Sequence, residues 1–420
     1  MQHTQFRLNY TEMEQAQAGL SDRFALLALF PAHYSWPPEE AAALWATDTG
    51  PAAGSLDLLQ QRRLVERGPG RDPMYSMPDV VRRLASEYLA SHPDLTAPGQ
   101  ERLITYYAGV AAANGEGVPA HIAAITDVYD ALTLALTWAE QQQRWAEVSV
   151  MARALARFFY MRRMTNQYRS MLMRGIYAAQ QTKRLDEQAW YLREQGSLAA
   201  DSGDFDQAIQ AFEQSIDLCR QLGDERNEAQ GLYEWGRAEA TRGHHETARH
   251  LINESMDIMR ELQHGVLQPA TLHDLADLSI KQGLYDQAQR EMEEALNAEI
   301  DRGDLRAQAE TLYQLGELAG DRGRAQQAAD YYLRSLVLDR RLKDRRHGGM
   351  NLAALGLLAA LGNDAPTATR CWVAALALLR AADAPEAADV DRALDRHLGA
   401  ARQNLPPDAE RRALAEWWGL

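Results

Sequence analysis

Apolar and small residues recur at every fortieth position through the C-terminal half of this chain of 420 residues. Each unit has a leucine, a glycine or alanine four positions later, an alanine twelve positions after that, and a bulky apolar residue four positions further on. These spacings place side chains on one face of a helix, so each unit predicts a pair of helices. The leucines are Leu192, Leu232, Leu272, Leu312 and Leu352, and the small residues are Gly196, Gly236, Ala276, Gly316 and Gly356. The alanines are Ala208, Ala248, Ala288, Ala328 and Ala368, and the bulky residues are Phe212, Ile252, Met292, Tyr332 and Trp372.

The small position indicates how the two helices of a unit pack. Two helices approach closely only where one of them carries glycine or alanine, and a large neighbour then fills the adjacent space. Seven positions later, Gly203, Gly243, Gly283 and Gly323 are predicted to end the first helix in a left-handed conformation. In the fifth unit Asn363 and Asp364 stand at this break instead. A single pair cannot bury its apolar face, so we expect the units to stack.

These units resemble tetratricopeptide repeats of the longer, 40-residue kind, over about Leu185–Ala388. An unrelated helical bundle would not keep such a fixed register. The resemblance implies an all-α, right-handed superhelical solenoid, with five units in residues 186–388, that binds another macromolecule. Residues 96–185 are expected to form a helical linker with degenerate repeat-like pairs, because Ala156, Tyr168 and Leu172 extend the register upstream. Residues 389–420 are expected to form capping helices, broken at Pro406 and Pro407, with Trp417 and Trp418 packed on the last repeat.

Residues 1–95 carry a different pattern. An apolar helix, Leu20–Phe30, stops at Pro31, and a second helix starts at Pro37 and Pro38. Ser55 is expected to cap a third helix, Leu56–Arg67. A turn at Gly68–Gly70, a short strand at Met74–Met77 and a helix over Val80–Ala90 capped by Asp79 complete the segment. Three helices, a small β wing and a closing helix are typical of a winged-helix domain.

Several of these stretches resemble the NB-ARC-type STAND regulators of bacteria. Leu26–Pro31 with Ala41–Trp45 resembles their winged-helix subdomain, and Thr126–Ala139 resembles the helix that joins it to tetratricopeptide repeats. Tyr75–Asp79 lies where those proteins carry a Met-His-Asp motif. The resemblance implies a sensor whose repeats capture a protein or peptide and whose winged helix passes that event to an NTPase core, in cis or in trans.

Two departures from that family argue against nucleotide binding by this chain. Pro78 stands where the family's histidine would contact the nucleotide, and proline has no side-chain donor. The pattern G-x-x-x-x-G-K-[ST] occurs nowhere in the sequence. We therefore predict no cofactor, and the chain is either a fragment without its NTPase core or a protein that lost it.

Charge and composition disfavour other classes of function. The 44 basic and 59 acidic residues give a net charge of −15, which is opposite to that of a non-specific nucleic-acid binder. Arg62, Arg63 and Arg67 are predicted on the third helix, where a winged helix could read DNA. DNA is nonetheless a disfavoured partner, because residues 1–95 hold eight basic and twelve acidic residues.

Two cysteines, Cys219 and Cys371, with no signal-peptide pattern and no apolar run of membrane-spanning length, predict a cytoplasmic protein that is not in a membrane. His245 and His250 are five residues apart, which turns them off a common helix face and disfavours a metal site. Motifs for acyl or phosphoryl transfer do not occur, so no catalytic residue and no enzymatic activity are predicted.

The first helix of each repeat is expected to line an inner groove, at offsets −6, −3, +1, +4 and +5 from the small residue. The predicted partner-binding residues are Arg153, Arg157, Trp190, Arg193, Tyr233, Arg237, His273, Lys281 and Tyr313, together with Asp277, Glu317 and Asp321. The early units carry arginines, which predicts a clamp for an acidic or C-terminal carboxylate segment. The alternative is that these arginines pair with neighbouring glutamates on solvated helices, and both interpretations stay open.

Three classes of function remain at this stage. The leading one is the protein- or peptide-binding sensor or scaffold portion of a STAND-like signalling regulator. The second is a peptide-sensing transcription regulator whose winged helix binds DNA, which a salt-dependent DNA-binding assay would reveal. The third is a passive assembly scaffold.

Overall fold

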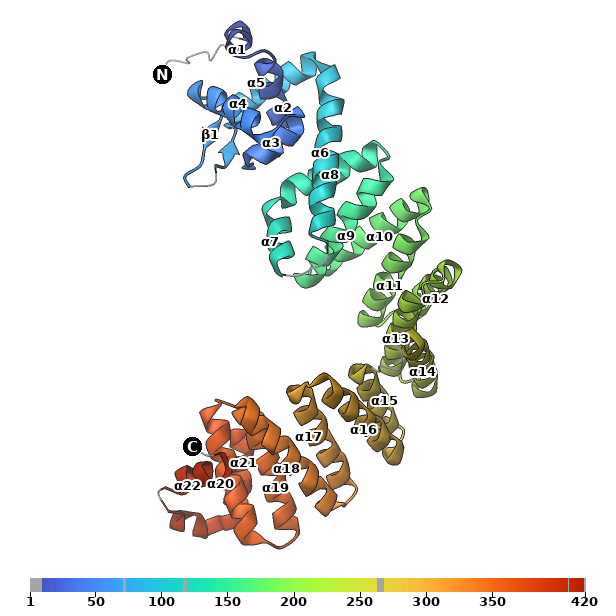
Figure 1. Cartoon of the computed structure of the whole chain (residues 1–420), viewed down its shortest axis with the longest axis vertical. Helices are drawn as coiled ribbons and strands as arrows, with labels where there is room; N and C mark the ends of the chain where they lie inside the picture. Colours follow the sequence, from blue (N-terminus) through green and yellow to red (C-terminus); the bar gives the residue numbers. More distant parts are fainter. Residues whose placement is uncertain (1–9, 71–72, 116–118, 263–267, 407, 419–420) are drawn as a thin grey trace. The chain divides into compact units, whose positions relative to one another are not determined.

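The computed structural model describes residues 10–70, 73–115, 119–262, 268–406 and 408–418. Over these residues the chain is helical apart from one two-stranded sheet and the connecting turns (Figure 1). It divides into two compact units, Met1–Asp224 and Glu225–Leu420. Among the described residues no single helix is long and apolar enough to cross a membrane; the bent pair Ala120–Asp127 and Tyr129–Gln141, at 72°, could do so by length and composition only.

The N-terminal segment of the first unit begins with helices and ends with a hairpin and one more helix. The elements are α1 (Tyr10–Ala16), α2 (Leu20–Leu26), the 3-10 helix η1 (Leu27–Leu29), α3 (Pro38–Trp45), α4 (Thr49–Gln61), β1 (Glu66–Arg67), β2 (Tyr75–Ser76) and α5 (Asp79–Ser91). β1 and β2 are antiparallel, and Trp36 extends the sheet by exchanging two 2.8 Å backbone hydrogen bonds with Tyr75. The only strands described here are two residues long, so the winged-helix assignment stays a prediction.

Two predicted features of this segment are wrong. α4 begins at Thr49, seven residues earlier than expected, and Ser55 is buried inside it, where its hydroxyl accepts a 2.7 Å hydrogen bond from Arg23. Glycines and Pro51 made the first turns of α4 look like a loop, yet proline is tolerated in the first turn of a helix. Pro78, and not Asp79, stands at the N-cap of α5, and no side-chain capping bond forms there.

The arginines considered for DNA reading do not share a helix. α4 ends at Gln61, Arg62 follows it as the C-cap, and Arg63 has a positive φ of 61° in the turn. Arg67 lies in β1. The expectation that these three arginines lie on the third helix is therefore wrong.

The described residues that follow are helical, and from Trp145 to Ala381 the helices form pairs. The first unit contains α6 (Pro93–Ala113), α7 (Pro119–Asp127), α8 (Tyr129–Gln141), α9 (Trp145–Met161), α10 (Thr165–Thr182), α11 (Leu185–Asp201) and α12 (Phe205–Leu222). The second contains α13 (Glu225–Arg242), α14 (His245–Leu262), α15 (Pro269–Lys281), α16 (Tyr285–Arg302), α17 (Leu305–Asp321), α18 (Ala325–Leu342), α19 (Arg345–Leu361) and α20 (Ala365–Ala381). It ends with α21 (Ala387–Leu398), the 3-10 helix η2 (Gly399–Asn404) and α22 (Ala409–Trp418).

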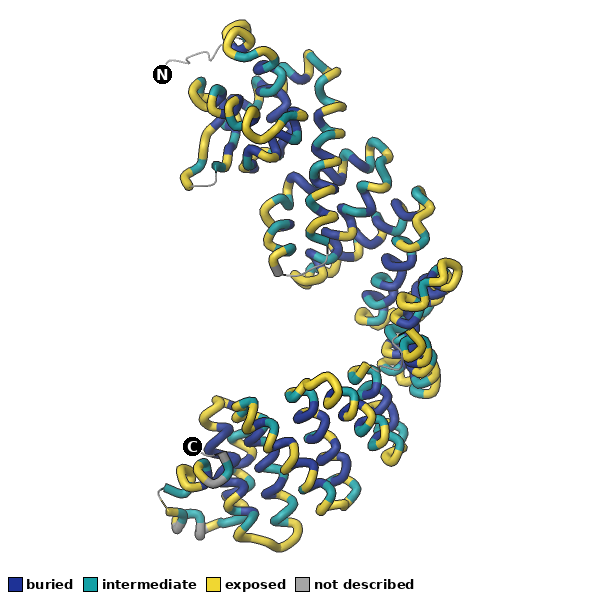
Figure 2. Tube along the Cα trace, viewed as in Figure 1, coloured by how far each residue is buried: buried dark blue, intermediate teal, exposed yellow. Residues whose placement is uncertain are grey.

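The predicted close approach within each repeat is present. A Cβ atom placed on Gly316 would lie 2.5 Å from the ring of Tyr332, and one on Gly196 would lie 2.8 Å from Phe212. Ala276, the small residue of the third unit, is fully buried. The positions that repeat in the sequence are therefore the positions that pack. Figure 2 shows buried residues along the helices of each pair and mostly exposed residues at the turns.

Left-handed residues mark the turns at every twentieth position, from 143 to 383, wherever the turn is described; position 263 lies outside the described residues. They are Gln143, Arg163, Lys183, Gly203, Gly223, Gly243, Gly283, Gly303, Gly323, Lys343, Asn363 and Asp383. Gly203 has a φ of 78° and ends α11 as predicted, and Asn363 takes this conformation in the fifth unit. Arg163 and Lys183 continue the series upstream, so α9 and α10 share the turn pattern of the repeats.

A buried serine in the second helix also repeats, although the sequence pattern described above did not include it. Ser215, Ser255 and Ser335 each donate a hydrogen bond of 2.6–2.8 Å to a backbone carbonyl 26 residues earlier, in the first helix of the same pair. Each bond satisfies a hydroxyl that would otherwise be buried without a partner. The spacing of these serines, which follows the repeat, was the signal that could have revealed them.

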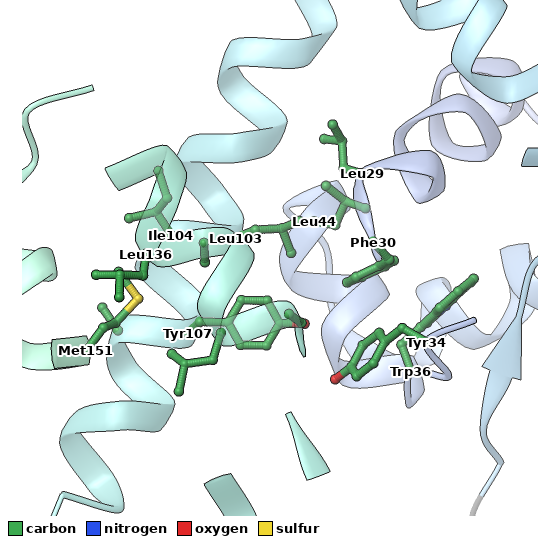
Figure 3. Packing of buried hydrophobic residues seen from close by; sticks show 14 of the residues in the cluster. Leu29, Phe30, Tyr34, Trp36, Leu44, Leu103, Ile104, Tyr107, Leu136 and Met151 are labelled. Atoms are coloured by element: carbon green, nitrogen blue, oxygen red, sulfur yellow. The ribbon is translucent and has the colours of Figure 1, made fainter. Parts of the chain in front are cut away.

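One hydrophobic core joins the N-terminal helices to α6, α8 and α9 (Figure 3). Leu29 and Leu44 lie on the N-terminal side of this core and Leu103 on α6. Glu40 on α3 is buried here, and its carboxylate accepts hydrogen bonds from Tyr34 at 2.9 Å and from Tyr107 on α6 at 2.7 Å. The segment predicted as a linker therefore packs as part of the first unit.

The C-terminal helices pack on the last repeat. α21 and α22 both contact α20, and Trp417 packs against the core of the second unit. These helices therefore cover apolar surface that the last repeat would otherwise expose. The side chain of Trp418 and the whole of Pro407 lie outside the described residues.

Candidate functional site

A cleft of about 900 Å³ opens in the second unit, where α15, α17, α19 and α21 supply most of its wall (helices located in Figure 1). Side chains from the second helices of the repeats reach into it. The lining residues are Asp277, Ile280, Tyr285, Met292, Tyr313, Gln314, Glu317, Leu318, Gly320, Asp321, Tyr332, Met350, Ala353, Ala354, Leu357, Leu358, Leu361, Trp372, Leu379, Glu386, Asp389, Val390, Ala393 and Arg396.

The predicted offsets describe this lining well. Relative to the small residue of each repeat, Asp277, Glu317 and Leu357 all occupy offset +1. Offsets −3, +4 and +5 are also represented, for example by Tyr313 and Asp321 on α17. The first helices of three consecutive repeats, α15, α17 and α19, therefore line one cleft with residues at the same positions of the repeat.

Apolar and aromatic side chains form much of the surface. Leu357 and Leu361, one turn apart on α19, are 55% and 72% exposed although they are large apolar residues. The rings of Tyr313 and Tyr332 lie 5.6 Å apart, and the indole of Trp372 donates a 3.1 Å hydrogen bond to the carbonyl of Ala353. The aromatic side chains are thus held in place, and the leucines are open to a partner.

The charged groups of the cleft are mostly carboxylates. Glu386 forms an ion pair with Arg346, and Asp389 with Arg392. Asp277, Glu317 and Asp321, in contrast, have no basic partner within 4.0 Å among the residues that the structure describes. Arg396 is the one basic residue of the lining given above.

Glu317 shows the electrostatic consequence. Burial raises the pKa of its carboxyl, the charge of Asp321 raises it further, and the Tyr313 hydroxyl opposes both effects. Burial and the charge of Glu317 raise the pKa of Tyr313 to about 12. Glu317 and Asp321 therefore repel each other, and burial adds to the cost of ionising Glu317.

Three of the predicted residues in the first unit, Arg153, Arg157 and Trp190, form an arginine and tryptophan cluster. The guanidinium carbons of Arg153 and Arg157 lie 4.5 and 5.3 Å from the centre of the Trp190 ring. Such contacts contribute roughly 0.5–2 kcal/mol. Nε of Arg157 and Nε1 of Trp190 are buried with no hydrogen-bond partner among the described residues. This cluster presents the exposed Arg153 at the surface.

Arg193 differs from the expectation of a solvated groove residue. It is only 4% exposed, and its guanidinium pairs with Glu194 at 3.3 Å, which in turn accepts a 2.7 Å hydrogen bond from Tyr168. Arg193 thus pairs with a neighbouring glutamate, as in the alternative interpretation, but it does so in a buried place and not on a solvated helix surface. An Arg193→Glu substitution would break buried contacts and test the fold more than it tests binding.

Tyr233 and Arg237 lie together on α13 in the second unit. The Tyr233 hydroxyl donates a hydrogen bond to Asp274 on α15, and burial, followed by this carboxylate, raises the pKa of Tyr233. Arg237 is largely exposed, with Nε 3.9 Å from the same carboxylate and its guanidinium carbon 5.9 Å from the Tyr233 ring. Asp274 therefore competes with any external acid for Arg237.

Of the residues predicted from the sequence, Asp277, Tyr313, Glu317 and Asp321 line the cleft, whereas His273 and Lys281 do not. His273 is held by two internal partners, Glu299 at 3.1 Å and Thr311 at 3.0 Å. Lys281 is exposed at the end of α15 and is not among the lining residues. The prediction from the sequence missed Met350, Ala353, Leu357 and Leu361, which the same offsets from Gly356 would have given.

Residues 187–261 match the tetratricopeptide repeat family. A search of curated protein sequences gives no significant match. RapI, solved without ligand, is 11% identical with a TM-score of 0.53, covering 76% of this chain and 86% of its own, which shows a shared fold.

Two further solved structures are similar with lower scores. One is a STAND protein with a tetratricopeptide repeat sensor from Pyrococcus horikoshii, at 14% identity and a TM-score of 0.49 over 100% of this chain and 68% of that one. The other is the apo quorum sensor NprR from B. thuringiensis, at 16% identity and a TM-score of 0.41 over 70% and 86%. The chain has a tetratricopeptide-type helical repeat fold.

Proposed function

We propose that this chain is a receptor for a segment of another protein or a peptide, and that the cleft of the second unit holds that segment. The observation that carries the proposal is the cleft itself: about 900 Å³, with Leu357 and Leu361 exposed on its wall. Exposed large apolar side chains grouped in a concave site mark binding surfaces. We also propose that the chain is not an enzyme.

The wider setting of this proposal is a cytoplasmic, STAND-like bacterial regulator. Its support is the resemblance of Leu26–Pro31, Ala41–Trp45 and Thr126–Ala139 to the NB-ARC family. In this setting the N-terminal segment is the winged-helix subdomain, and it passes binding to an NTPase core in cis or in trans. The core that joins this segment to α6, α8 and α9 supports such a relay, because packed elements move together.

A pair of matched substitutions tests the receptor function. Leu357→Glu places a charge in the cleft, whereas Val337→Glu places one on an equally exposed apolar position of α18 outside it; the two side chains are 55% and 60% exposed. Peptides are selected from a random displayed library on the full chain, and their affinities are measured by fluorescence anisotropy. We expect Leu357→Glu to weaken the selected peptides by about tenfold or more, and Val337→Glu to leave them unchanged.

The receptor function is contradicted if no selected peptide depends on Leu357. Equal losses in the two variants would show that binding lies elsewhere or that the effect is general. Thermal midpoints of both variants should match that of the wild type, because both positions are exposed.

A second candidate ligand rests on the cluster of Arg153, Arg157 and Trp190. Arginine over an aromatic ring can hold a carboxylate bidentately while the ring packs against an apolar neighbour. We propose an acidic or C-terminal carboxylate segment as the ligand of this cluster. Peptides ending in a free carboxylate should bind more tightly than their amides, and Arg153→Ala should remove the difference.

A further inference from the structure

The carboxylates and the leucines of the cleft in the second unit lie on three consecutive first helices that line the same cavity. Asp277 comes from α15, Glu317 and Asp321 from α17, and Leu357 and Leu361 from α19. Resting on the proposed function, we propose that this cleft binds a cationic amphipathic protein segment, whose lysines or arginines pair with the three carboxylates while its apolar side chains cover the leucines.

Charge complementarity is the first argument. Other carboxylates at the edge of the cleft already have cationic partners, namely Arg346 for Glu386 and Arg392 for Asp389. The three named above have none among the described residues. An acidic segment would place like charges against them, and Arg396 alone would offset this. A cationic segment meets unpaired acids instead.

Mutual repulsion within the cleft is the second argument. Glu317 and Asp321 are four residues apart on α17, so they lie on the same face about one helical turn, roughly 5–6 Å, from each other. Burial and the neighbouring charge both disfavour ionisation of Glu317. A bound ammonium or guanidinium group would relieve this repulsion, so affinity and ionisation of the cleft should be coupled.

The apolar wall restricts the partner to a segment that also carries large apolar side chains. A lysine-rich segment without them would leave Leu357 and Leu361 in water. The two leucines are themselves one turn apart on α19, which matches apolar side chains spaced three or four residues apart on a partner helix. The cleft thus favours a partner by the spacing of its apolar side chains as well as by its charge.

A pair of synthetic peptides tests the charge of the partner. The probe is a labelled amphipathic peptide of leucine and lysine, about 14 residues or four helical turns, and its counterpart has glutamate at every lysine. Both are titrated with the full chain by fluorescence anisotropy. The leucine and lysine peptide should bind about tenfold or more tightly than its acidic counterpart, with a preference that decreases as salt is added.

Two variants, each with three carboxylates neutralised, show whether the basic peptide binds at the cleft. The cleft variant combines Asp277→Asn, Glu317→Gln and Asp321→Asn. The control combines Glu213→Gln, Asp217→Asn and Asp301→Asn, which changes the net charge equally at exposed positions outside the cleft. The cleft variant should weaken the basic peptide by about tenfold, and the control by less than about twofold. Unchanged thermal midpoints show that both variants fold.

Equal weakening in both variants would overturn the inference, since it would show general attraction to an acidic protein. Failure of the basic peptide to bind also overturns it. If library peptides that depend on Leu357 nevertheless bind, and are neutral or acidic, the receptor function stands and only the class of partner is wrong. If no peptide depends on Leu357, the receptor function itself fails.

Discussion

Single residues set the spacing between the helices of each repeat, and Gly236 shows how little room there is. A Cβ atom on Gly236 would lie 2.6 Å from Cγ1 of Ile252 and 3.1 Å from the carbonyl oxygen of Ala248. The backbone contact cannot move without shifting α14. Glycine is therefore required here by packing, although it costs helix propensity.

Gly236→Leu should lower the free energy of unfolding by about 1–3 kcal/mol or more, because the side chain overpacks the crossing of α13 and α14. Gly320→Ala is the matched control, since a Cβ there would meet only the Cβ of Ala328, at 4.0 Å. This change should stabilise α17 by about 0.5–1 kcal/mol. Thermal unfolding of both variants measures the effects, and an unchanged midpoint for Gly236→Leu would contradict the packing described.

Between elements, Glu40 joins α3 to α6 through the Tyr34 and Tyr107 hydroxyls. Burial raises the pKa of Glu40 to about 7, and the hydrogen bonds from the two tyrosines oppose this only in part. The folded protein therefore holds the proton more tightly than the unfolded chain, whose glutamate has a pKa near 4.5.

Because the pKa of Glu40 is higher in the folded protein than in the unfolded chain, its contribution to the free energy of unfolding should decrease as the pH rises. The contribution of Glu40 to stability is complete below about pH 4.5 and is lost as the pH rises through about 7. Glu40→Gln cannot ionise, so it should stabilise the protein relative to the wild type by on the order of 2 kcal/mol more at pH 8 than at pH 5. Denaturant unfolding at both pH values measures this difference.

Glu39→Gln provides the control for that experiment. Glu39 is the neighbouring carboxylate on α3, but it is exposed, so the variant has the same net charge without the buried position. Its stability should follow the wild type at both pH values. A Glu40→Gln variant that also follows the wild type would show that Glu40 is not buried in solution.

For the molecule as a whole, the sequence predicts that this chain alone does not bind ATP or ADP. The phosphate-binding pattern is absent, and Pro78, at the N-cap of α5, has no donor to offer a phosphate. Calorimetry with ATP or ADP should detect no binding by this chain alone. A dissociation constant below about 10 μM, roughly −7 kcal/mol, would contradict the prediction.

The repeats were predictable because one physical requirement recurs in every unit. Gly196 and Phe212 must fit each other, and the same fit is repeated at Gly316 and Tyr332, so register and packing coincide. The start of α4 was not predictable in this way, since the stretch from Thr49 to Ser55 has no helical apolar pattern and is fixed by tertiary contacts of Ser55.

The candidate site was predicted in part for a related reason. Offsets from the small residue identify which positions face the cleft, and Tyr313 follows them. The offsets do not show which of these side chains already bind partners within the protein. The burial of Arg193 and the hydrogen bonds of His273 to internal partners are therefore seen only in the structure. The fifth unit was overlooked although the same offsets apply to it.

The regular spacing of the turns has a consequence for how such a chain can change in length. A segment of one full repeat, such as 284–323, begins and ends at equivalent turns, so its duplication or removal preserves the alternation of first and second helices. A change of half a repeat would instead place a second helix next to another second helix and leave its buried serine and alanine facing water. Insertions and deletions during evolution should therefore come in whole repeats, and the breadth of the binding surface should vary in discrete steps.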